Sequence, residues 1–321
     1  MSDRQPVSVL GSTLILTLAA FIWGMCFVAQ RSGMEYIGPF LFNGIRELLG
    51  ALTLLALWAV FALLSVFRGR IRADSAPSQR RSLLIGGIIC GIALYLASNL
   101  QQIGMVYVTA SKAAFITTLY IILVPVLGLL MRHRPHWNIW ASVGIATVGL
   151  YLLCINSNFA LELGDAVLVA SAVFWAIHIL AVGHFAPHLG FLRLVRLCIV
   201  QFSVAGVLSM LSAPFADSVF VSTPLSWEVI GFVTPELAYA GILSTGIAFT
   251  LAAVGQKHVK PQTAAVVMSL ESVFGLLGGA LLLGESLSSR ELVGCGLMFI
   301  AVILTQINFK ARPRAEGARF D

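Results

Sequence analysis

Long runs of apolar residues follow one another along the whole chain, and short polar segments separate them. A bilayer has a hydrocarbon core about 30 Å thick, so a helix that crosses it needs about 20 mostly apolar residues. Measured against this length, the pattern predicts ten membrane-spanning helices. They cover residues 11–31, 39–67, 82–104, 109–130, 137–155, 164–184, 194–213, 236–256, 262–283 and 290–309. These runs are too continuous for the strands of a membrane barrel, which alternate apolar and polar residues over roughly 10 positions.

The composition supports this interpretation. Of the 321 residues, 59% are hydrophobic and 11% are charged, and the mean hydropathy is +0.94. A soluble domain carries about a quarter charged residues to cover its surface, so lipid must surround much of this chain. The five cysteines are scattered through apolar runs without a C-x-x-C pair. We therefore expect buried thiols, no disulfide framework, no metal site and no cofactor, in an all-α membrane protein.

Basic residues lie almost entirely on one side of the predicted topology. If the ten helices alternate in direction, one set of loops and tails holds sixteen Lys and Arg residues, and the other holds only Arg31 and Arg290. Positively charged loops stay in the cytoplasm. The sequence therefore predicts a multi-pass protein of the cell (inner) membrane with both termini cytoplasmic. These basic loops face anionic lipid and account for the net charge of +6. No nucleic-acid partner is therefore expected.

The chain also repeats itself after about 150 residues. Trp23 and its flanking alanines match Trp175, IALYLASNLQ (92–101) matches IAFTLAAVGQ (247–256), and AAF (113–115) matches AAV (264–266). The offsets are 152, 155 and 151, which indicates one duplication of five helices, over residues 1–157 and 158–321. Because five is odd, the second copy must enter the membrane upside down. Inverted repeats with a midplane site at their interface are typical of secondary transporters.

These stretches resemble the drug/metabolite transporter superfamily, EamA branch. The resemblance covers nearly the whole chain and includes FIWGMCFVAQRSG (21–33), QQIGMVYVTASKAAFITTLYIILVP (101–125) and SLESVFGLLGGALLLGESLSSRELVGCGL (269–297). It implies ten helices in an inverted five-plus-five repeat and alternating access across the inner membrane, usually to export small metabolites. The family's usual Glu-Pro pair is Glu271–Ser272 here. Without the proline, a straighter helix is expected at this point.

Glu271 is the most unusual residue of the apolar pattern. Counting from Pro261 at 1.5 Å per residue places it about 15 Å deep, at the bilayer midplane. A charge there costs at least about 2.5–3.5 kcal/mol, and a low dielectric favours the neutral carboxyl. We therefore expect Glu271 to face a cavity, and it is a candidate for proton coupling. Packing roles remain open: an ion pair with Lys112 or Arg46, or hydrogen bonds to Ser269 and Ser272.

Two cations lie within apolar helices. Arg46 is about 10 Å into the membrane from Pro39, too deep for its side chain to reach the interface easily. It is a candidate to attract a substrate carboxylate or to fix a gate, or else it pairs structurally with Glu47. Lys112 is three residues into its helix, so it either lines the cavity or extends to the outer interface.

Polar and aromatic residues at similar depths complete the candidate site. Tyr120 is the repeat partner of Glu271, and His178 shares a helix face with Trp175. These residues either line the cavity or serve packing, and a membrane His can also relay protons. The amides have the alternative of hydrogen bonding between helices. The further candidates are Trp23, Trp175, Asn99, Gln101 and Gln102. We expect the cavity to be lined by helices 82–104, 109–130, 236–256 and 262–283.

Sequence motifs do not favour an enzyme. HFAPH (184–188) lacks the glutamate of a zinc-protease helix and contains a proline, and the chain has no phosphate-binding G-x-x-x-x-G-K-[ST] loop. The sequence therefore predicts a monomeric secondary transporter that exports a small organic metabolite, amino-acid-like or drug-like, with protons as the candidate coupling ion. The alternative is a membrane-embedded enzyme or a channel.

Overall fold

A computed structural model describes residues 9–34, 36–67, 77–108, 110–132, 135–154, 163–220, 226–283 and 288–306. Within these ranges, side chains are described except at 64–67, 77–80, 110–112, 115, 153–154, 188, 279–283 and 306. This part of the chain is helical and contains no strand. The helices are α1 (Val9–Gly33), α2 (Pro39–Phe67), α3 (Pro77–Tyr107), α4 (Ala110–Thr118), α5 (Tyr120–Leu130), α6 (Trp137–Cys154), α7 (Leu163–Phe185), η1 (Ala186–His188), α8 (Phe191–Ala216), η2 (Asp217–Val219), α9 (Trp227–Ala238), η3 (Tyr239–Ala248), α10 (Phe249–Gly255), α11 (Pro261–Met268), α12 (Glu271–Leu283) and α13 (Ser289–Gln306).

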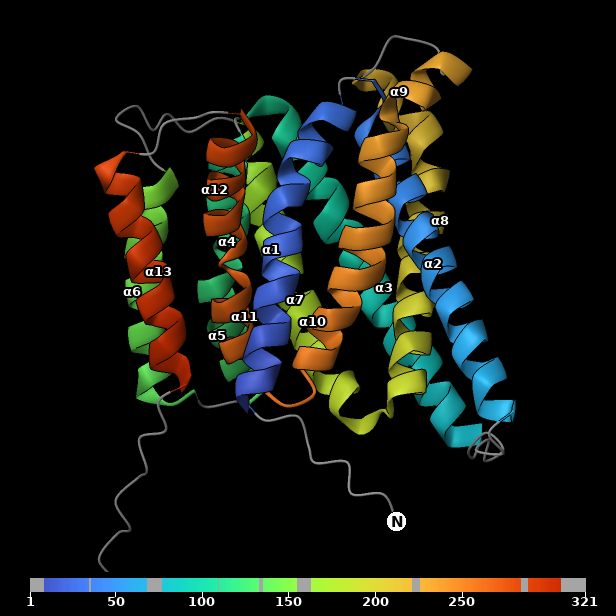
Figure 1. The fold of residues 1–321 in the computed structure, drawn as a ribbon, viewed down its shortest axis with the longest axis horizontal. Coiled ribbons are helices and arrows are strands. Elements are labelled where there is room, and N and C mark those ends of the chain that lie inside the picture. Colours follow the sequence, from blue (N-terminus) through green and yellow to red (C-terminus); the bar gives the residue numbers. More distant parts are fainter. Residues whose placement is uncertain are drawn as a thin grey trace, which may run out of the picture.

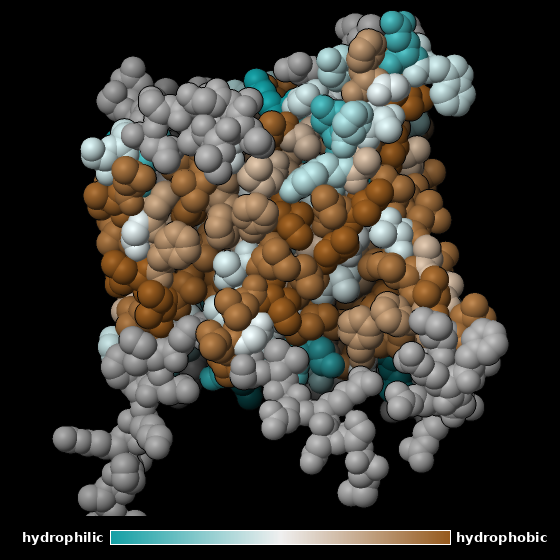
Figure 2. Space-filling view, viewed as in Figure 1, coloured by the Kyte–Doolittle hydropathy of each residue, from teal (hydrophilic) through white to brown (hydrophobic). Residues whose placement is uncertain are grey.

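Helix lies in each of the ten predicted ranges, and local sequence signals explain several boundaries. Pro39, Pro77 and Pro261 are each the first residue of a helix, where the fixed φ of proline suits the helix and its missing N–H leaves no internal bond unmade. Six continuous helical stretches are long and apolar enough to cross a membrane, and Ile116–Leu130 and Trp137–Leu152 are shorter apolar helices. The face shown in Figure 2 carries a broad hydrophobic band, with hydrophilic residues visible beyond it at both ends.

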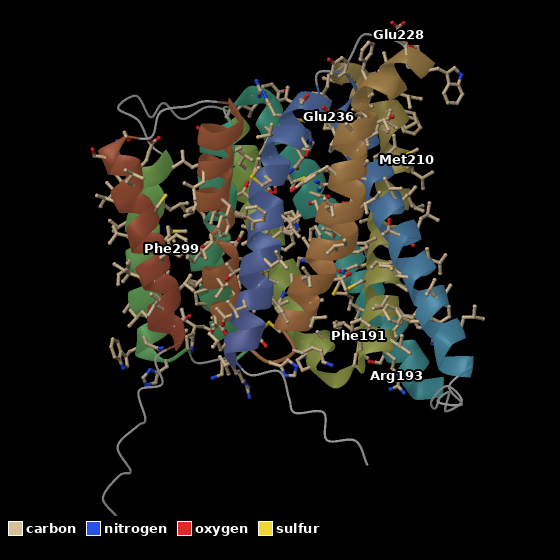
Figure 3. The ribbon with its side chains drawn as sticks, in the orientation of Figure 1. Phe191, Arg193, Met210, Glu228, Glu236 and Phe299 are labelled. Atoms are coloured by element: carbon tan, nitrogen blue, oxygen red, sulfur yellow. The ribbon has the colours of Figure 1, made fainter. Side chains whose placement is uncertain are left out.

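The helices stand side by side in one bundle (Figure 1). α3 packs along α7, α2 along α8, and α6 along α13. The α6–α13 pair forms one edge of the bundle and α2 and α8 form the opposite edge, with α1, α7 and α10 between them. Glu228 and Glu236 lie at one end of the molecule and Arg193 at the other (Figure 3).

Two of the predicted spans are interrupted near their middle. α4 ends at Thr118 and α5 begins at Tyr120, while α11 ends at Met268 and α12 begins at Glu271. The expectation of a straighter helix at Glu271–Ser272 was therefore wrong. The backbone tightens there through bonds from Leu270 N to Val267 O and from Ser272 N to Ser269 O, both at 3.2 Å. Such i→i+3 bonds replace helical ones without any proline.

A third irregularity lies in the span from α9 to α10. Its central part, η3, is a π-helix of ten residues. π-Helical turns are rare and frequently lie at functional sites. The indole Nε1 of Trp23 in α1 donates a hydrogen bond to the carbonyl oxygen of Ser244 in η3, at 3.3 Å. The wider turn is thus tied to α1 near the centre of the bundle.

Candidate functional site

A cavity lies among the helices that surround the two interruptions. The space between its atoms totals about 690 Å³, open solvent included. Its walls are formed by Trp23, Phe27, Gln30, Arg46, Gln101, Thr117, Tyr120, Trp175, His178, Ile179, Val182, Gln201, Ser244, Phe249, Ala252, Ala253, Gln256, Met268 and Glu271. A wall of apolar and aromatic side chains with a few polar groups is typical of small-molecule sites.

The cavity is shared by more helices than we expected. The predicted spans 82–104, 109–130, 236–256 and 262–283 all contribute, but α1, α2, α7 and α8 contribute too. The expectation that four spans line the path was therefore incomplete. None of the wall residues belongs to α6 or α13, which pack on each other at the edge of the bundle.

An aromatic cluster around Phe249 forms one wall. Trp23 meets the Phe249 ring edge-on at a centroid distance of 4.7 Å, and Trp175 stacks on it at 5.9 Å with an interplanar angle of 23°. The imidazole of His178 approaches the same ring edge-on at 5.9 Å. Aromatic faces of this kind bury large apolar area in a fixed geometry. The wall therefore suits a flat or apolar part of a ligand.

Glu271 and Tyr120 meet across the two interruptions. The hydroxyl of Tyr120 donates to Oε1 of Glu271 at 3.0 Å, and Glu271 is only 7% exposed. The hydroxyls of Thr118 and Ser272 are also bonded to each other, at 2.9 Å. Each interruption thus contributes one residue to each of the two contacts. The carboxyl group of Glu271 lies in the first turn of α12, where the helix dipole favours negative charge.

The serines considered as partners of Glu271 bond elsewhere. Ser269 Oγ donates to Val266 O at 2.7 Å, and Ser272 bonds Thr118. No Lys or Arg nitrogen of the described side chains is within ion-pair distance of Glu271, so the pairing with Arg46 does not form here. The side chain of Lys112, the other candidate partner, lies outside the described side chains.

Arg46 is a buried cation in the cavity wall, 4% exposed. Its Nε has no hydrogen-bond partner in the described part of the chain. Glu47 does not pair with it: Glu47 Oε1 accepts from Ser98 Oγ at 2.9 Å, and Oε2 is buried without a partner. A buried unpaired charge is costly, so the guanidinium has unused capacity to bind an anionic group.

Two further predicted residues bond across the wall. His178 Nε2 is 3.0 Å from Gln201 Oε1, and Trp175 Nε1 donates to Gln101 Oε1 at 2.7 Å. These contacts join α7 to α8 and to α3. They fix the polar side chains of the wall and hold the Trp175 indole in place.

Asn99 and Gln102 do not line the cavity. Asn99 bonds Asn43 of α2 and Ser209 of α8, and Gln102 is fully buried with its amide nitrogen 3.5 Å from the carbonyl oxygen of Gln30. Their amides bond between helices, which was the alternative use considered for them. The structure thus brings together seven of the ten candidates: Glu271, Arg46, Tyr120, Trp23, Trp175, His178 and Gln101.

Sequence reasoning missed several wall residues, among them Gln30, Gln201, Ser244 and Phe249. Gln30 and Gln201 carried a usable signal, because each is an amide inside an apolar run. Phe249 carried none, since phenylalanine is common throughout the chain. The oxygens Gln30 Oε1 and Gln256 Oε1 are buried without hydrogen-bond partners among the described residues, and both residues line the cavity. They are free to accept hydrogen bonds from a ligand or from water.

The thiols of Cys26, Cys90, Cys198 and Cys295 are free and buried. Within the described ranges, His, Cys, Asp and Glu side chains form no cluster of three or more that could hold a metal ion.

Comparison with known proteins gives a consistent result over the whole chain. The model of the EamA-like transporter family matches twice, over residues 10–155 and 162–307. An uncharacterized transporter of Archaeoglobus fulgidus is 28% identical over 94% of this chain and 88% of its own length. The uncharacterized inner membrane transporter YedA of Escherichia coli K12 is 24% identical, over 98% and 96%. A protein of known crystal structure superposes with a TM-score of 0.69 at 18% identity, over 93% of this chain and 97% of that one, which shows a shared fold.

Proposed function

Because the chain belongs to the EamA-like transporter family, we propose that it exports a small organic metabolite, amino-acid-like or drug-like, by alternating access across the inner membrane. Membership makes it a multi-pass membrane transporter of the drug/metabolite type. The observation that carries the rest of the proposal is the central cavity, which combines an unpaired cation, a carboxyl group and an aromatic wall. Midplane cavities beside interrupted helices are the substrate sites of many secondary transporters.

In this proposal the ten helical spans form two inverted five-helix repeats, over residues 1–157 and 158–321. Two observations support it. The family model matches the two halves separately, and the interruptions at Leu119 and at Ser269–Leu270 fall at positions related by the sequence repeat. The two halves rock around the cavity, so that its opening alternates between the two sides of the membrane.

The proposed orientation places both termini in the cytoplasm. Arg193 lies at one end of the bundle and Glu228 and Glu236 at the other (Figure 3), in agreement with the cytoplasmic position of basic loops. A phosphatase reporter that is active only in the periplasm, fused after Asp321, should be inactive, and the same reporter inserted at Ser288 should be active. The reverse pattern would overturn the orientation.

For substrate binding, we assign the anionic group to Arg46 and the apolar or flat part to the wall of Trp23, Trp175 and Phe249. The carboxyl group of Glu271, held by Tyr120, serves a second polar group of the substrate or a coupling proton. Charge-assisted hydrogen bonds contribute about 1.5–3 kcal/mol each, so loss of the Arg46 contact should weaken binding roughly 10- to 100-fold.

A binding assay with purified protein tests this assignment. A library of aromatic and aliphatic carboxylic acids is screened by thermal stabilisation, and each hit is paired with its methyl ester. Acids should stabilise the protein more than their esters, and Arg46→Gln should abolish that difference. Arg290→Gln, near the outer loop, serves as the control and should preserve it. Equal binding of acids and esters by the wild-type protein would contradict the role of Arg46 without affecting the family assignment.

Transport itself is measured with the hits in proteoliposomes. Arg46→Lys keeps the charge but loses the planar fork of donors, so its transport rate should lie between those of the wild type and Arg46→Gln. Movement of a hit with no saturation and no counterflow would indicate a channel and overturn alternating access.

A further inference from the structure

A second group of buried and half-buried polar side chains lies between α2, α3 and α8, outside the cavity wall. It consists of Asn43, Glu47, Tyr95, Ser98, Asn99, Ser209 and Ser212, which we name the polar seam. Asn43 is 0% exposed and Glu47 1% exposed. Asn43 and Glu47 are four residues apart on α2, so they lie one turn apart on the same helix face. None of the proposed transport steps uses this carboxyl group.

The hydrogen bonds of the seam determine how its amides are oriented. Asn99 Nδ2 donates to Tyr95 O at 2.9 Å and to Ser209 Oγ at 2.8 Å. A backbone carbonyl can only accept, so the nitrogen of Asn99 must be on this side and its oxygen on the other. Asn99 Oδ1 accepts from Asn43 Nδ2 at 3.2 Å. The Asn43 amide is thereby fixed as well, with Oδ1 as a pure acceptor.

Two acceptor oxygens of the seam then have no donor. Asn43 Oδ1 and Glu47 Oε2 are both buried and without hydrogen-bond partners in the described part of the chain. A buried unsatisfied oxygen destabilises the fold, and more so if it is charged. A single proton on Glu47 turns Oε2 into a donor, and Asn43 Oδ1, one helical turn away on the same face of α2, is an acceptor without a donor. The other oxygen, Oε1, keeps its bond from Ser98.

We propose that Glu47 is a second proton-binding site of the transporter. Its Oε2 takes up a proton from water, and the resulting O–H donates a hydrogen bond to Asn43 Oδ1. The protonated carboxyl group joins α2 to α3 through Ser98, and Asn43 and Asn99 continue the connection to α8. Loss of the proton leaves an ionised carboxylate buried between helices, with Glu47 Oε2 and Asn43 Oδ1 both without a donor. Protonation therefore favours the helix packing seen here.

The helices packed on α2 carry several charged or titratable groups. Besides Arg46 of α2 itself, they are Arg80, Arg81, Cys90, Tyr95 and Tyr107 on α3, Arg193, Arg196 and Cys198 on α8, Asp217 on η2, Glu228 and Glu236 on α9, and Tyr239 on η3. The Tyr95 hydroxyl is bonded to Ser212 Oγ at 2.7 Å, and both Asp217 oxygens accept from the backbone at the start of α2, from Phe40 N and Leu41 N. Arg46 is the neighbouring cation whose charge opposes a proton on Glu47, and its side chain lines the cavity instead.

Coupling between anion binding at Arg46 and proton binding at Glu47 rests on the proposed function. An anionic substrate bound at Arg46 neutralises the charge that opposes the proton, so substrate binding should increase the affinity of Glu47 for its proton. Linkage is reciprocal, and protonation of Glu47 should strengthen anion binding by the same factor. Substrate and proton would then be bound through adjacent residues of one helix.

Infrared difference spectroscopy tests the site without any substrate. The C=O stretch of a protonated carboxyl group is separate from the bands of a carboxylate. In a Glu271→Gln background at neutral pH, Glu47→Gln should remove one protonated-carboxyl band, whereas Glu228→Gln, which removes an exposed carboxylate, should remove none. Ser98→Ala should shift the same band, because the carboxyl oxygen loses its hydrogen bond. If neither Glu47→Gln nor Ser98→Ala changes the protonated-carboxyl region, Glu47 is ionised and a buried water donates to Glu47 Oε2 and Asn43 Oδ1. That result overturns the proposal.

Thermal unfolding provides a second readout. If the folded protein holds a proton on Glu47 that the unfolded chain releases, a rise in pH favours unfolding. The melting temperature of the Glu271→Gln protein should therefore fall as the pH rises, and Glu47→Gln should reduce this slope, since its amide donates to Asn43 permanently. If Glu47→Gln leaves the slope of melting temperature against pH unchanged, the proposed proton site is overturned. A positive infrared result together with absent anion transport would instead retain the proton site and reject the proposed function.

Discussion

The two interrupted helices of the cavity have similar backbones and different chemistry. In the first half, Leu119 N bonds Ile116 O at 3.2 Å and α5 begins at Tyr120; in the second, Leu270 N bonds Val267 O at 3.2 Å and α12 begins at Glu271. The two bonds are 151 residues apart, the offset of the repeat. The first residue after each break is a tyrosine in one half and a glutamate in the other, and the tyrosine hydroxyl donates a hydrogen bond to the glutamate.

The packing around the two breaks differs as well. A Cβ on Gly24 of α1 would lie 2.6 Å from the carbonyl oxygen of Glu271 and 2.7 Å from Gly275 N, so α1 and α12 touch backbone to backbone. The repeat partner of Gly24 is Ala176. The repeated sequence thus supplies two breaks with similar backbones. Substitutions at a few positions give only the second break a carboxyl group.

The largest effect is expected from Glu271→Gln. The amide keeps the shape of the side chain and can still accept from Tyr120, but it carries no titrating group. If Glu271 couples protons, the variant should fold normally and lose the pH dependence of transport in proteoliposomes. Glu228→Gln, at an exposed position at one end of the bundle, should keep it. Transport that responds to pH as in the wild type would leave Glu271 a packing residue.

Gly24→Ala tests the close contact on the glutamate side. The added methyl group must push α1 and α12 apart, because it meets two backbone atoms and the Cβ of Phe274, none of which can turn away. Overpacking of this kind costs about 1–3 kcal/mol. The matched control is Gly144→Ala in α6, where a Cβ meets nothing within 4 Å, and its melting temperature in detergent should be unchanged or higher. Equal melting temperatures for both variants would refute the tight contact.

Tyr120→Phe removes only the hydroxyl that links the two breaks. The loss of one buried hydrogen bond should cost about 1 kcal/mol. The pH response of transport should shift but persist, because the carboxyl group remains. Tyr151→Phe on the exposed face of α6 should alter neither. A complete loss of pH response in Tyr120→Phe would mean that the tyrosine takes part in proton transfer itself.

The smallest effect is expected from Ser272→Pro, which restores the family's usual residue. Proline is tolerated in the first turn of a helix, and the change removes the Ser272 N bond to Ser269 O and the contact with Thr118. Stability should fall by about 1 kcal/mol or less. Ala265→Pro, within α11, should cost about 3 kcal/mol or more. A large loss in Ser272→Pro would show that the break depends on the serine.

Much of the fold could be predicted because the bilayer constrains it. The ten apolar ranges all contain helix, and prolines mark several starts. Arg46, Trp23, Tyr120, Trp175, His178 and Glu271, which the sequence pattern singled out, all line the central cavity. The interruption at Ser269–Leu270 was not predicted, since it arises from local i→i+3 bonds and serine contacts rather than from a proline.

The apolar runs of the sequence were enough to locate the helices, because a chain surrounded by lipid must satisfy its backbone hydrogen bonds within each helix. The rotation of each helix about its axis became clear only in the tertiary structure. Lipid and protein interior are equally apolar, so hydrophobicity does not orient a membrane helix, and packing between neighbours must do so. Gln101 and Gln102 show this: the first bonds Trp175 at the cavity, and the second is fully buried between helices beside Gln30.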